Sequence, residues 1–428
     1  MISQDDSKGG SDYKLINRCV LLSSTLNVNI SSSVIPENMI YDVLIVGGGL
    51  VGASLAAALK PSGLTVALVE GQSAIHNATG MDAQGWDNRV YAVSPGSVEF
   101  LKECGAWQGL DKSRIQPVEA MRVFGDVHSE LEFTAYQLGV PELAFILESR
   151  LLLAALWQEL PQQQNLTLFH STRCSHLAWH EDHASLTLED GRELRTKLVV
   201  GADGNDSWVR QQAAMDESSK PYHQHGIVAN FKIEKPHRNT AYQWFRPDGI
   251  LALLPLPDEH ASMVWAVSPE QSAELLALPH PELCAQVSAI TDGMVGVLQM
   301  VTSPVAFPLR LLNLPHIIKP RLALIGDAAH NLHPLAGQGV NMGFRDAREL
   351  ARVLLQRSAQ QDCGNIHLLR RYERARQEDI FSMQFTTDAL KKLFNNRNPL
   401  LRTMRNVGLT AVNRLVPLKK MLARHALN

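Results

Sequence analysis

The sequence lacks any apolar run of the roughly 18 residues that a membrane-spanning helix needs, although 45% of its 428 residues are hydrophobic. It also lacks internal repeats and, outside its first residues, low-complexity segments. This composition excludes a fibrous or wholly disordered protein. The apolar share is sufficient for a large core, and the length predicts roughly two to three domains.

Cysteine is scarce, and its spacing excludes two kinds of site. No two cysteines have the C-x-x-C spacing of a zinc site or a redox dithiol; they are Cys19, Cys104, Cys174, Cys284 and Cys363. A sparse, odd set is typical of a reducing compartment, so we expect a cytoplasmic protein. His330 and His333 lie three residues apart but do not form a recognisable set of metal ligands, so we expect them to be structural and expect no metal.

Neither sign of charge dominates the whole chain. The formal net charge of -3 excludes a global field that would attract nucleic acid. The distribution is uneven, because residues 391–428 contain nine Lys or Arg and no Asp or Glu, which leaves -12 on the rest. This apolar and basic segment either lies peripherally on the inner face of an anionic membrane or packs on the protein with its cations in solvent.

Residues 1–38 differ from the rest of the chain. They are rich in Ser and Asn, begin with acidic residues, and contain only a short apolar stretch. A secretory signal would place basic residues before a longer apolar core. We therefore expect a disordered extension.

A βαβ unit begins directly after this extension. Residues 40–46 are almost continuously apolar and β-branched, which predicts a strand buried on both faces of a parallel sheet. An Ala-rich helix is expected over 50–59, ending at Pro61 and Gly63. A second buried strand is expected over 64–70. Such units are typical of dinucleotide-binding domains.

The middle of the chain reads differently. Short alternating strands are predicted at 121–124, 131–136, 185–188, 227–233 and 262–267, and Asp190-Gly191 predicts a hairpin turn. These strands suggest an antiparallel domain inserted into the first. The chain then returns to a buried strand at 321–325 and a long helix from about Gly339, and it is helical from His367 onward.

The first chemical motif lies between the first strand and the first helix. Gly47, Gly49 and Gly52 form G-x-G-x-x-G, which permits a tight turn, close approach of a pyrophosphate, and close packing of helix on strand. The helix N-terminus favours an anion. Glu70 ends the second strand, where an acid accepts hydrogen bonds from an adenosine ribose. The alternative is an ordinary glycine turn.

Two further strands end in Gly and Asp. Strand 198–200 leads into Gly201-Ala202-Asp203-Gly204, which on its own also reads as an Asx turn. The later strand leads into Gly326-Asp327 and then a loop with Pro334, Gly337, Gln338 and Gly339 before a long helix containing Asn341. Asp327 can accept hydrogen bonds from a polyol. The loop glycines let a flat ring lie against bare backbone, and the helix N-terminus favours the negative charge of a reduced flavin.

Together these motifs resemble the class A flavin monooxygenases, the group typified by p-hydroxybenzoate hydroxylase. Within that group, four short sequence segments resemble those of the ubiquinone-biosynthesis FAD-dependent hydroxylases: Arg89–Ser94, Pro334–Asn341, Tyr372–Arg376 and Leu401–Leu409. The resemblance extends from about Met39 to the C-terminus. One departure is Ser149, where the family often has Asn.

The resemblance implies roles for individual residues. Gly47, Gly49, Gly52 and Glu70 would hold the ADP half of FAD, and Arg89 would lie near the pyrophosphate or ribityl chain. Asp203 would lie near the pyrophosphate. Asp327 would bind the ribityl chain or pyrophosphate, and Pro334, Gly337 and Gly339 would line the isoalloxazine. The remaining predicted cofactor contacts are Gly326, Gln338 and Asn341. No catalytic side chain is predicted beyond the flavin-facing loop of Pro334, Gly337 and Gly339.

The resemblance also implies a fold and a reaction. The expected α/β fold is a Rossmann-type FAD-binding domain (39–115 with 145–215 and 311–365), an inserted β-rich substrate domain (116–144 with 216–310) and a helical C-terminal region (366–428). The expected reaction is hydroxylation of a polyprenylated phenol in ubiquinone biosynthesis through a flavin C4a-hydroperoxide. It would use FAD, O2, and NAD(P)H or another reductant, and the candidate partners are a membrane surface and a biosynthetic complex.

Two other functions stay open at this point. One is hydroxylation of a different small aromatic substrate, which the apolar tail and the lack of an arginine cluster in the middle domain disfavour. The other is a non-catalytic flavoprotein subunit of a biosynthetic complex. Intact glycine and acid positions in all three motifs disfavour lost activity.

Overall fold

The computed structural model describes residues 39–72, 85–125, 130–215, 218–246, 248–331 and 339–394. Contacts divide the chain into Met1–Met39 and Ile40–Asn428, and the second unit is described below. The expectations for residues 1–38 and 395–428, and for Pro334, Gly337 and Gln338, fall outside the described residues. No helix within the described ranges is long and apolar enough to cross a membrane.

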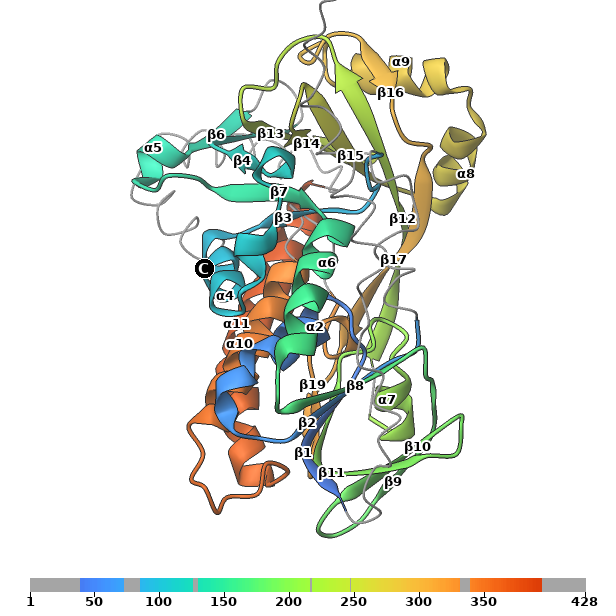
Figure 1. Ribbon diagram of the computed structural model, residues 1–428. Helices are drawn as coiled ribbons and strands as arrows, with labels where there is room; N and C mark the ends of the chain where they lie inside the picture. Colours follow the sequence, from blue (N-terminus) through green and yellow to red (C-terminus); the bar gives the residue numbers. More distant parts are fainter. Residues whose placement is uncertain are drawn as a thin grey trace, which may run out of the picture. The chain divides into compact units, whose positions relative to one another are not determined.

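The first sheet has a parallel centre with the strand order β19-β11-β1-β2-β8 (Figure 1). β1 and β2 are almost wholly buried, as expected for strands covered on both faces. β18 extends this sheet at one edge, and an antiparallel pair, β9 and β10, is attached to β11. The bounds are β1 Ile40–Val46, β2 Val66–Glu70, β8 Leu166–His170, β9 Cys174–Trp179, β10 Ala184–Leu188, β11 Glu193–Gly201, β18 Ile318–Lys319 and β19 Leu322–Leu324.

Parallel pairing places the ends of four strands at one edge of the sheet. Val46 lies beside Gly201 and Val69, and Gly201 lies beside Leu324. The three Gly- and Asp-containing motifs and Glu70 therefore leave the sheet at the same edge. In open α/β sheets, ligands bind at this carboxyl edge.

Helices pack beside this sheet and on one another. α2 (Leu50–Ala58) contacts both α6 (Ser149–Glu159) and α10 (Gly339–Leu355), and α10 contacts α11 (Ile366–Phe394). The close contact of α2 with α10 depends on Gly343, where an added Cβ would lie 2.4 Å from a methyl group of Val51. α4 (Pro95–Glu103) packs on α10 as well.

The second sheet is mostly antiparallel, with the order β16-β12-β15-β14-β13-β5-β6, and β17 also pairs with β12. A small third sheet, β3-β7-β4, lies near it (Figure 1). The bounds are β3 Val90–Val93, β4 Gln116–Val118, β5 Ala120–Phe124, β6 Glu130–Thr134, β7 Ala144–Glu148, β12 Ser218–Ile233, β13 Thr240–Arg246, β14 Gly249–Leu256, β15 His260–Val267, β16 Leu298–Met300 and β17 Val305–Asn313.

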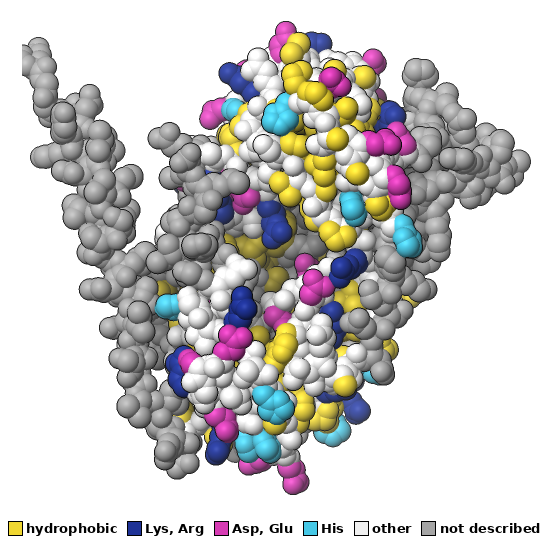
Figure 2. Space-filling view, turned by 90° about the vertical axis from the view of Figure 1, so that its right-hand side faces the viewer, with side chains coloured by type: hydrophobic (Ala, Val, Ile, Leu, Met, Phe, Trp, Pro, Cys, Tyr) yellow, Lys and Arg dark blue, Asp and Glu magenta, His cyan; other side chains and the backbone are white. Residues whose placement is uncertain are grey.

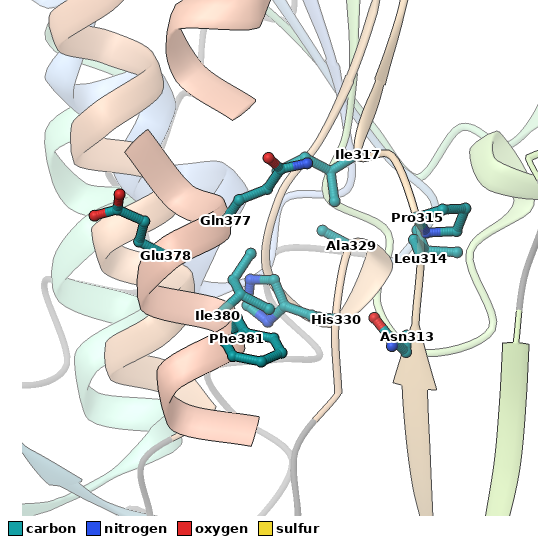
Figure 3. Close-up of a pocket in the computed structure, with 10 residues that line it drawn as sticks. All are labelled: Asn313, Leu314, Pro315, Ile317, Ala329, His330, Gln377, Glu378, Ile380 and Phe381. Carbon is teal, nitrogen blue, oxygen red and sulfur yellow. The ribbon is translucent and has the colours of Figure 1, made fainter. Parts of the chain in front are cut away.

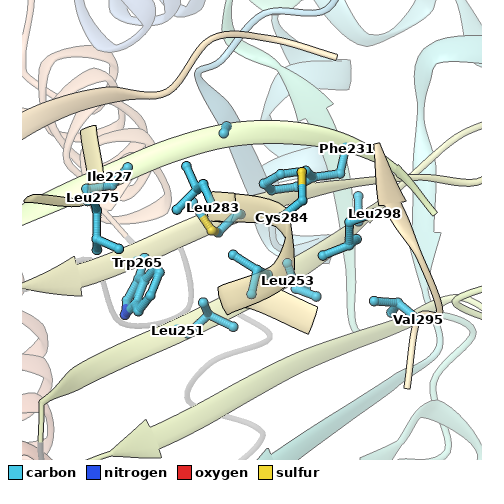
Figure 4. Close-up of a cluster of buried hydrophobic side chains, with 14 of the residues drawn as sticks. Ile227, Phe231, Leu251, Leu253, Trp265, Leu275, Leu283, Cys284, Val295 and Leu298 are labelled. Atoms are coloured by element: carbon cyan, nitrogen blue, oxygen red, sulfur yellow. The ribbon is translucent and has the colours of Figure 1, made fainter. Parts of the chain in front are cut away.

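One face of the second sheet is closed by two helices. Buried side chains of β12, β14 and β15, among them Phe231, Leu253 and Trp265, pack against Leu275 of α8 (Pro269–Ala277) and Leu283 of α9 (His280–Ile290) (Figure 4). This cluster is the core of the second sheet. Because side chains alternate along each strand, the residues between these must lie on the opposite face.

The opposite face, which we call the inner face, contacts residues 86–92 of the chain. Leu254 and Leu256 pack with Trp86 and Ala92, and the Asn230 side-chain amide donates to the Asp87 carbonyl at 2.9 Å. The centre of the inner face consists of Gly226, Val228 and Asn230 of β12, Ile250, Ala252 and Leu254 of β14, and Ser262, Val264 and Ala266 of β15, and the same alternation places Lys232, Leu256 and His260 at one end of it.

The structure confirms most expected elements and corrects two of them. Strand 185–188, expected among the middle strands, is β10 and belongs to the first sheet, because the hairpin at Gly191 pairs it with β11. The strand expected over 131–136 ends at Thr134, whose hydroxyl caps the short helix α5 (Ala135–Leu138). The domain boundaries given above stay a prediction.

Candidate functional site

The turn after β1 is held by close backbone contacts. Gly47 has φ +104°, and an added Cβ would lie 2.4 Å from the Ala202 carbonyl oxygen. A Cβ on Gly52 would lie 1.9 Å from the carbonyl oxygen of Gly47. Both glycines are therefore required for close packing of the turn against the second motif and of α2 against the turn.

The neighbouring glycine, Gly48, is also held on both sides, although the sequence did not single it out. Its N–H donates to Glu70 Oε2 at 2.6 Å, and its carbonyl accepts from Trp157 Nε1 at 2.8 Å. The other Glu70 oxygen accepts the N–H of Gln72 at 2.8 Å. Glu70 thus orients the turn, and each carboxylate oxygen keeps a lone pair for a further donor.

Gly49 is the glycine of this turn that has free space beside it. It is exposed, and a Cβ added to it would meet nothing within 4 Å. As the N-cap of α2, it provides no side-chain cap for the first N–H groups of the helix. These donors face open space at a helix N-terminus, which is the arrangement that favours an anionic group.

Asp203 of the second motif is engaged within its own turn. Its two oxygens accept the Ser207 hydroxyl at 2.5 Å and the Val209 N–H at 2.9 Å, which caps helix α7 (Trp208–Gln212). Desolvation by burial raises the pKa of Asp203, while these bonds oppose the shift. Asp203 therefore lies beside the first turn through Ala202, but its side chain has a local structural role.

The third turn, after β19, is Gly326–His330. Gly326 has φ +61°, and its N–H donates to Asp346 Oδ2 of α10 at 2.8 Å. His330 Nε2 bonds the same oxygen at 2.6 Å. Arg210, which follows the second motif, donates to the Ala328 carbonyl at 3.1 Å. The second and third motifs are thus joined directly.

Asp327 projects from this third turn and is exposed to solvent, yet protein surrounds it. Desolvation raises the pKa of Asp327, while His330 and Arg89 oppose the shift and Asp346 reinforces it. Arg89, an exposed cation at the start of β3, is therefore within electrostatic reach of Asp327. These two predicted site residues, far apart in sequence, share one electrostatic environment.

The segment that presents Arg89 is anchored by buried charges. Glu148 is fully buried and accepts the Asp87 N–H at 2.7 Å and Arg114 Nη2 at 2.5 Å. Arg150 also contacts Glu148, at 3.3 Å, and its backbone N–H donates to Asp87. Asp87 in turn accepts the N–H of Arg89 at 2.9 Å. This network fixes the segment that leads from Asp87 through Arg89 into β3.

Helix α10 connects these parts. Its first residue, Gly339, is exposed with open space around an added Cβ, so the backbone at the helix N-terminus is accessible. Asn341 is buried and bonds the Ala92 carbonyl at 2.8 Å and the Ser94 N–H at 2.9 Å. Asn341 therefore fixes the Arg89–Ser94 segment rather than pointing to open space.

A cavity of about 450 Å³ lies behind the third turn, between the residues that follow β17 and helix α11 (Figure 3). His330 and Ala329 form part of its wall, together with Leu314, Ile380 and Phe381. The cavity is mainly apolar and does not include the exposed residues Gly49, Arg89, Asp327 and Gly339.

Sequence reasoning and structure agree on where the described motifs meet, but three supporting groups were missed. They are Trp157 on the first turn, Glu148 with its arginines, and Asp346 with Arg376. A usable signal existed for two of them, because Glu and Asp in apolar stretches must have partners. The sequence cannot say which partners these are.

The chain matches the family model described as FAD binding domain over residues 40–383. It is 36% identical to 3-demethoxyubiquinol 3-hydroxylase of Escherichia coli (strain K12), over 91% of this chain and 99% of the relative. It is likewise 36% identical to ubiquinone hydroxylase UbiL of Rhodospirillum rubrum, over 91% of this chain and 90% of the relative.

Solved structures support the fold. The crystal structure of p-nitrophenol 4-monooxygenase PnpA from Pseudomonas putida superimposes with a TM-score of 0.72 at 15% identity, covering 91% of this chain and 98% of that one. The expected p-hydroxybenzoate hydroxylase-like fold is confirmed. The family model matches most of the chain, and both relatives are 36% identical to it over 91% of its length. The chain therefore belongs to the FAD-dependent hydroxylases of ubiquinone biosynthesis and is a flavin monooxygenase.

Proposed function

We propose that this protein hydroxylates the aromatic ring of a polyprenylated phenol in ubiquinone biosynthesis. The observation that carries the proposal is the uncharged centre of the inner face of the second sheet. The names of the two relatives, a demethoxyubiquinol hydroxylase and a ubiquinone hydroxylase, favour the same substrate class.

The described residues fit FAD at the carboxyl edge of the first sheet. The uncapped N-terminus of α2 at Gly49 is suited to the pyrophosphate, with Glu70 at the end of the next strand for the adenosine ribose. Asp327 and Arg89 are exposed in the same electrostatic environment, where they would hold the ribityl chain and pyrophosphate. The open N-terminus of α10 at Gly339 would face the ring.

When bound, FAD supplies the activation of O2 after reduction by NAD(P)H or another donor. The protein contributes binding, orientation and exclusion of water. A helix N-terminus at Gly339 stabilises negative charge that develops nearby, without reorganisation at the moment of reaction. The substrate ring has to reach the same place, so its contacts must come from the surface that faces this edge.

The inner face is the surface that argues for the substrate class. None of the nine residues at its centre is charged, and the central pair Ala252 and Val264 is only half-buried. The cation of this face, Lys232, lies at its end beside His260. The apolar character continues to the edge strand β17, where Val305 and Phe307 are 50% and 39% exposed. Figure 2 shows a hollow on the side of the molecule where β12 and β17 lie, with hydrophobic side chains inside and above it and charged side chains at its rim.

A substrate with a carboxylate would require a cation on this face. The neighbouring arginines are engaged elsewhere: Arg122 pairs with Glu130 at 2.5 Å, Arg246 with Asp248 at 2.9 Å, and Arg310 with Asp206 at 2.8 Å. Arg122 also lies over the ring of Phe124, which packs with the core on the opposite face. An apolar phenol suits this surface better than a small aromatic acid, because burying a carboxylate without a partner is costly.

The experiment is the quinone profile of cells that lack the gene, measured by mass spectrometry. We expect a polyprenylphenol that lacks one ring hydroxyl to accumulate, and its structure identifies the ring position. Restoration by the wild-type gene but not by Val264→Asp, with FAD retained in the purified variant, would place the substrate on the inner face. Val297→Asp, at a side chain that is 63% exposed, is the matched control and should restore the pool.

A normal quinone pool in the deletion strain would contradict the substrate class and leave the flavin monooxygenase assignment in place. Contact with a membrane or a biosynthetic complex remains a prediction, because it rests on residues 391–428, whose side chains fall outside the described part of the chain.

A further inference from the structure

A buried cluster of charges lies beneath the third turn and has no assigned role. Its centre is Asp346 on α10, which has no solvent exposure. Arg376 on α11 is 5% exposed, and its Nε donates to Asp346 Oδ1 at 2.7 Å. Arg376 Nη1 also donates to Asp379 at 2.6 Å, and Asp379 accepts from Arg345 at 3.1 Å.

The two oxygens of Asp346 have separate partners. Oδ1 faces Arg376, whereas Oδ2 accepts both the Gly326 N–H and His330 Nε2. Gly326 and His330 are the two ends of the third turn, and the His330 N–H also returns to the Gly326 carbonyl at 3.0 Å. One carboxylate oxygen therefore closes the turn from below, while the other ties it to α11.

This arrangement needs an ionised carboxylate. Burial opposes ionisation, but His330 and the Arg376 guanidinium outweigh it and lower the pKa of Asp346. Both donors on Oδ2 require an acceptor, and a neutral acid would turn one of its oxygens into a donor. Arg376 thus keeps the acceptor available rather than contacting the turn itself.

The consequence concerns Asp327, the side chain that the third turn presents. Asp327 follows Gly326 directly, and the left-handed conformation of Gly326, with φ +61°, sets the direction in which the chain leaves β19. Arg210 holds the Ala328 carbonyl in the middle of the turn, whereas Asp346 bonds both of its ends.

We propose that Asp346 is a positioning residue for FAD binding: held by Arg376, it fixes the turn Gly326–His330 so that Asp327 faces the cofactor. This inference rests on the proposed placement of the ribityl chain at Asp327. It does not depend on the identity of the aromatic substrate, so a failed quinone profile would leave it untouched.

The chain contains a matched control for this role. Asp346→Asn and Asp379→Asn each remove one carboxylate from Arg376, but only the first alters the group that Gly326 and His330 share. The amide of Asn has one acceptor oxygen, so its NH2 donor must face either the turn or Arg376. The FAD dissociation constant of each full-length variant would be measured by flavin fluorescence. Thermal unfolding of both apoproteins and hydrogen exchange of the peptide containing residues 326–331 would be recorded alongside.

We expect Asp346→Asn to weaken FAD binding about tenfold or more and to speed exchange in that peptide, whereas Asp379→Asn changes affinity less than about threefold. Equal losses of FAD affinity in the two variants, with equal falls in melting temperature, would show that the cluster only stabilises the fold. Unchanged affinity in Asp346→Asn, with the apoprotein folded, would also overturn the proposal.

Discussion

The turns after β1 and β19 present their exposed groups by different means. The first turn is shaped by backbone approaching backbone, with Gly47 against Ala202 and Gly52 against Gly47. The third turn is shaped by a buried carboxylate from a distant helix, Asp346. The first depends on residues that have no side chain, and the second on a side chain that must keep its charge.

The difference teaches why the two turns are not equally visible in a sequence. A spacing of glycines is local and can be recognised within six residues. The bond of Asp346 to Gly326 spans 20 residues and that of Arg376 to Asp346 spans 30, so no local sequence pattern predicts either bond. The two kinds of turn should also fail differently when changed.

The largest effect is expected for Gly52→Ala in the first turn. The new Cβ would lie 1.9 Å from the Gly47 carbonyl oxygen, and backbone cannot move away as a flexible side chain could. We expect a loss of about 3 kcal/mol in the free energy of unfolding, at the upper end of overpacking costs, and loss of bound FAD. Thermal unfolding and flavin content of the purified variant would test this, and a stable, flavin-loaded variant would contradict it.

The next effect concerns Asp327→Ala in the third turn. This change leaves donors of a buried polyol without an acceptor, which should weaken FAD binding by about 1–3 kcal/mol. The apoprotein should unfold normally, because Asp327 is exposed and no other residue in the described ranges bonds its side chain. Titration of the apoprotein with FAD would measure the loss, and unchanged affinity would remove Asp327 from the site.

The pH dependence of FAD binding should distinguish wild type from Asp327→Asn. The pKa of Asp327 is raised by desolvation, and a polyol donates to the ionised form. Binding therefore releases a proton, so the affinity of wild type should fall by up to about tenfold per pH unit as the pH drops below this raised pKa. The Asn variant should bind weakly but with a flat profile over the same range. Parallel profiles would count against the assignment.

A smaller effect is expected for Gly49→Ala, the counterpart of Gly52→Ala in the same turn. Its Cβ would meet nothing within 4 Å, so the melting temperature of the apoprotein should not fall. FAD affinity should still fall, by about 1–2 kcal/mol, because the methyl group occupies space that the pyrophosphate approaches. Calorimetric titration of the folded variant would show it, and full affinity would place the pyrophosphate elsewhere.

The smallest effect is expected for Trp157→Phe. The change removes the donor to the Gly48 carbonyl but keeps an aromatic ring beside the turn. We expect the free energy of unfolding to fall by about 1 kcal/mol and the FAD content to change little. Denaturant unfolding would measure it. A loss as large as that of Gly52→Ala would mean that the turn depends on side chains after all.

Much of the fold could be predicted because its signals are local. Strands β1 and β2 are continuous apolar runs, and the hairpin at Gly191 has its expected turn residues. The pairing of strands and side chains that lie far apart in the sequence could not be predicted. The alternation grouped strand 185–188 with the antiparallel strands of the middle of the chain, although the predicted FAD-binding domain included residues 145–215. Alternation identifies a strand but not the sheet that it joins. The sequence also did not show that both carboxylate oxygens of Asp203 accept hydrogen bonds within its own turn.

The measurement that tests the central claim most directly is oxygen incorporation by the purified, FAD-loaded protein. The protein would be given a reductant, isotopically labelled O2 and a polyprenylated phenol, with p-hydroxybenzoate as the comparison substrate, and the products analysed by mass spectrometry. The account predicts one labelled oxygen atom on the ring of the prenylated phenol and much slower labelling of the acid, because none of the nine residues at the centre of the inner face is a cation that could receive it. Labelling of the acid in preference to the phenol, or flavin reoxidation with no labelled product from either, would contradict it.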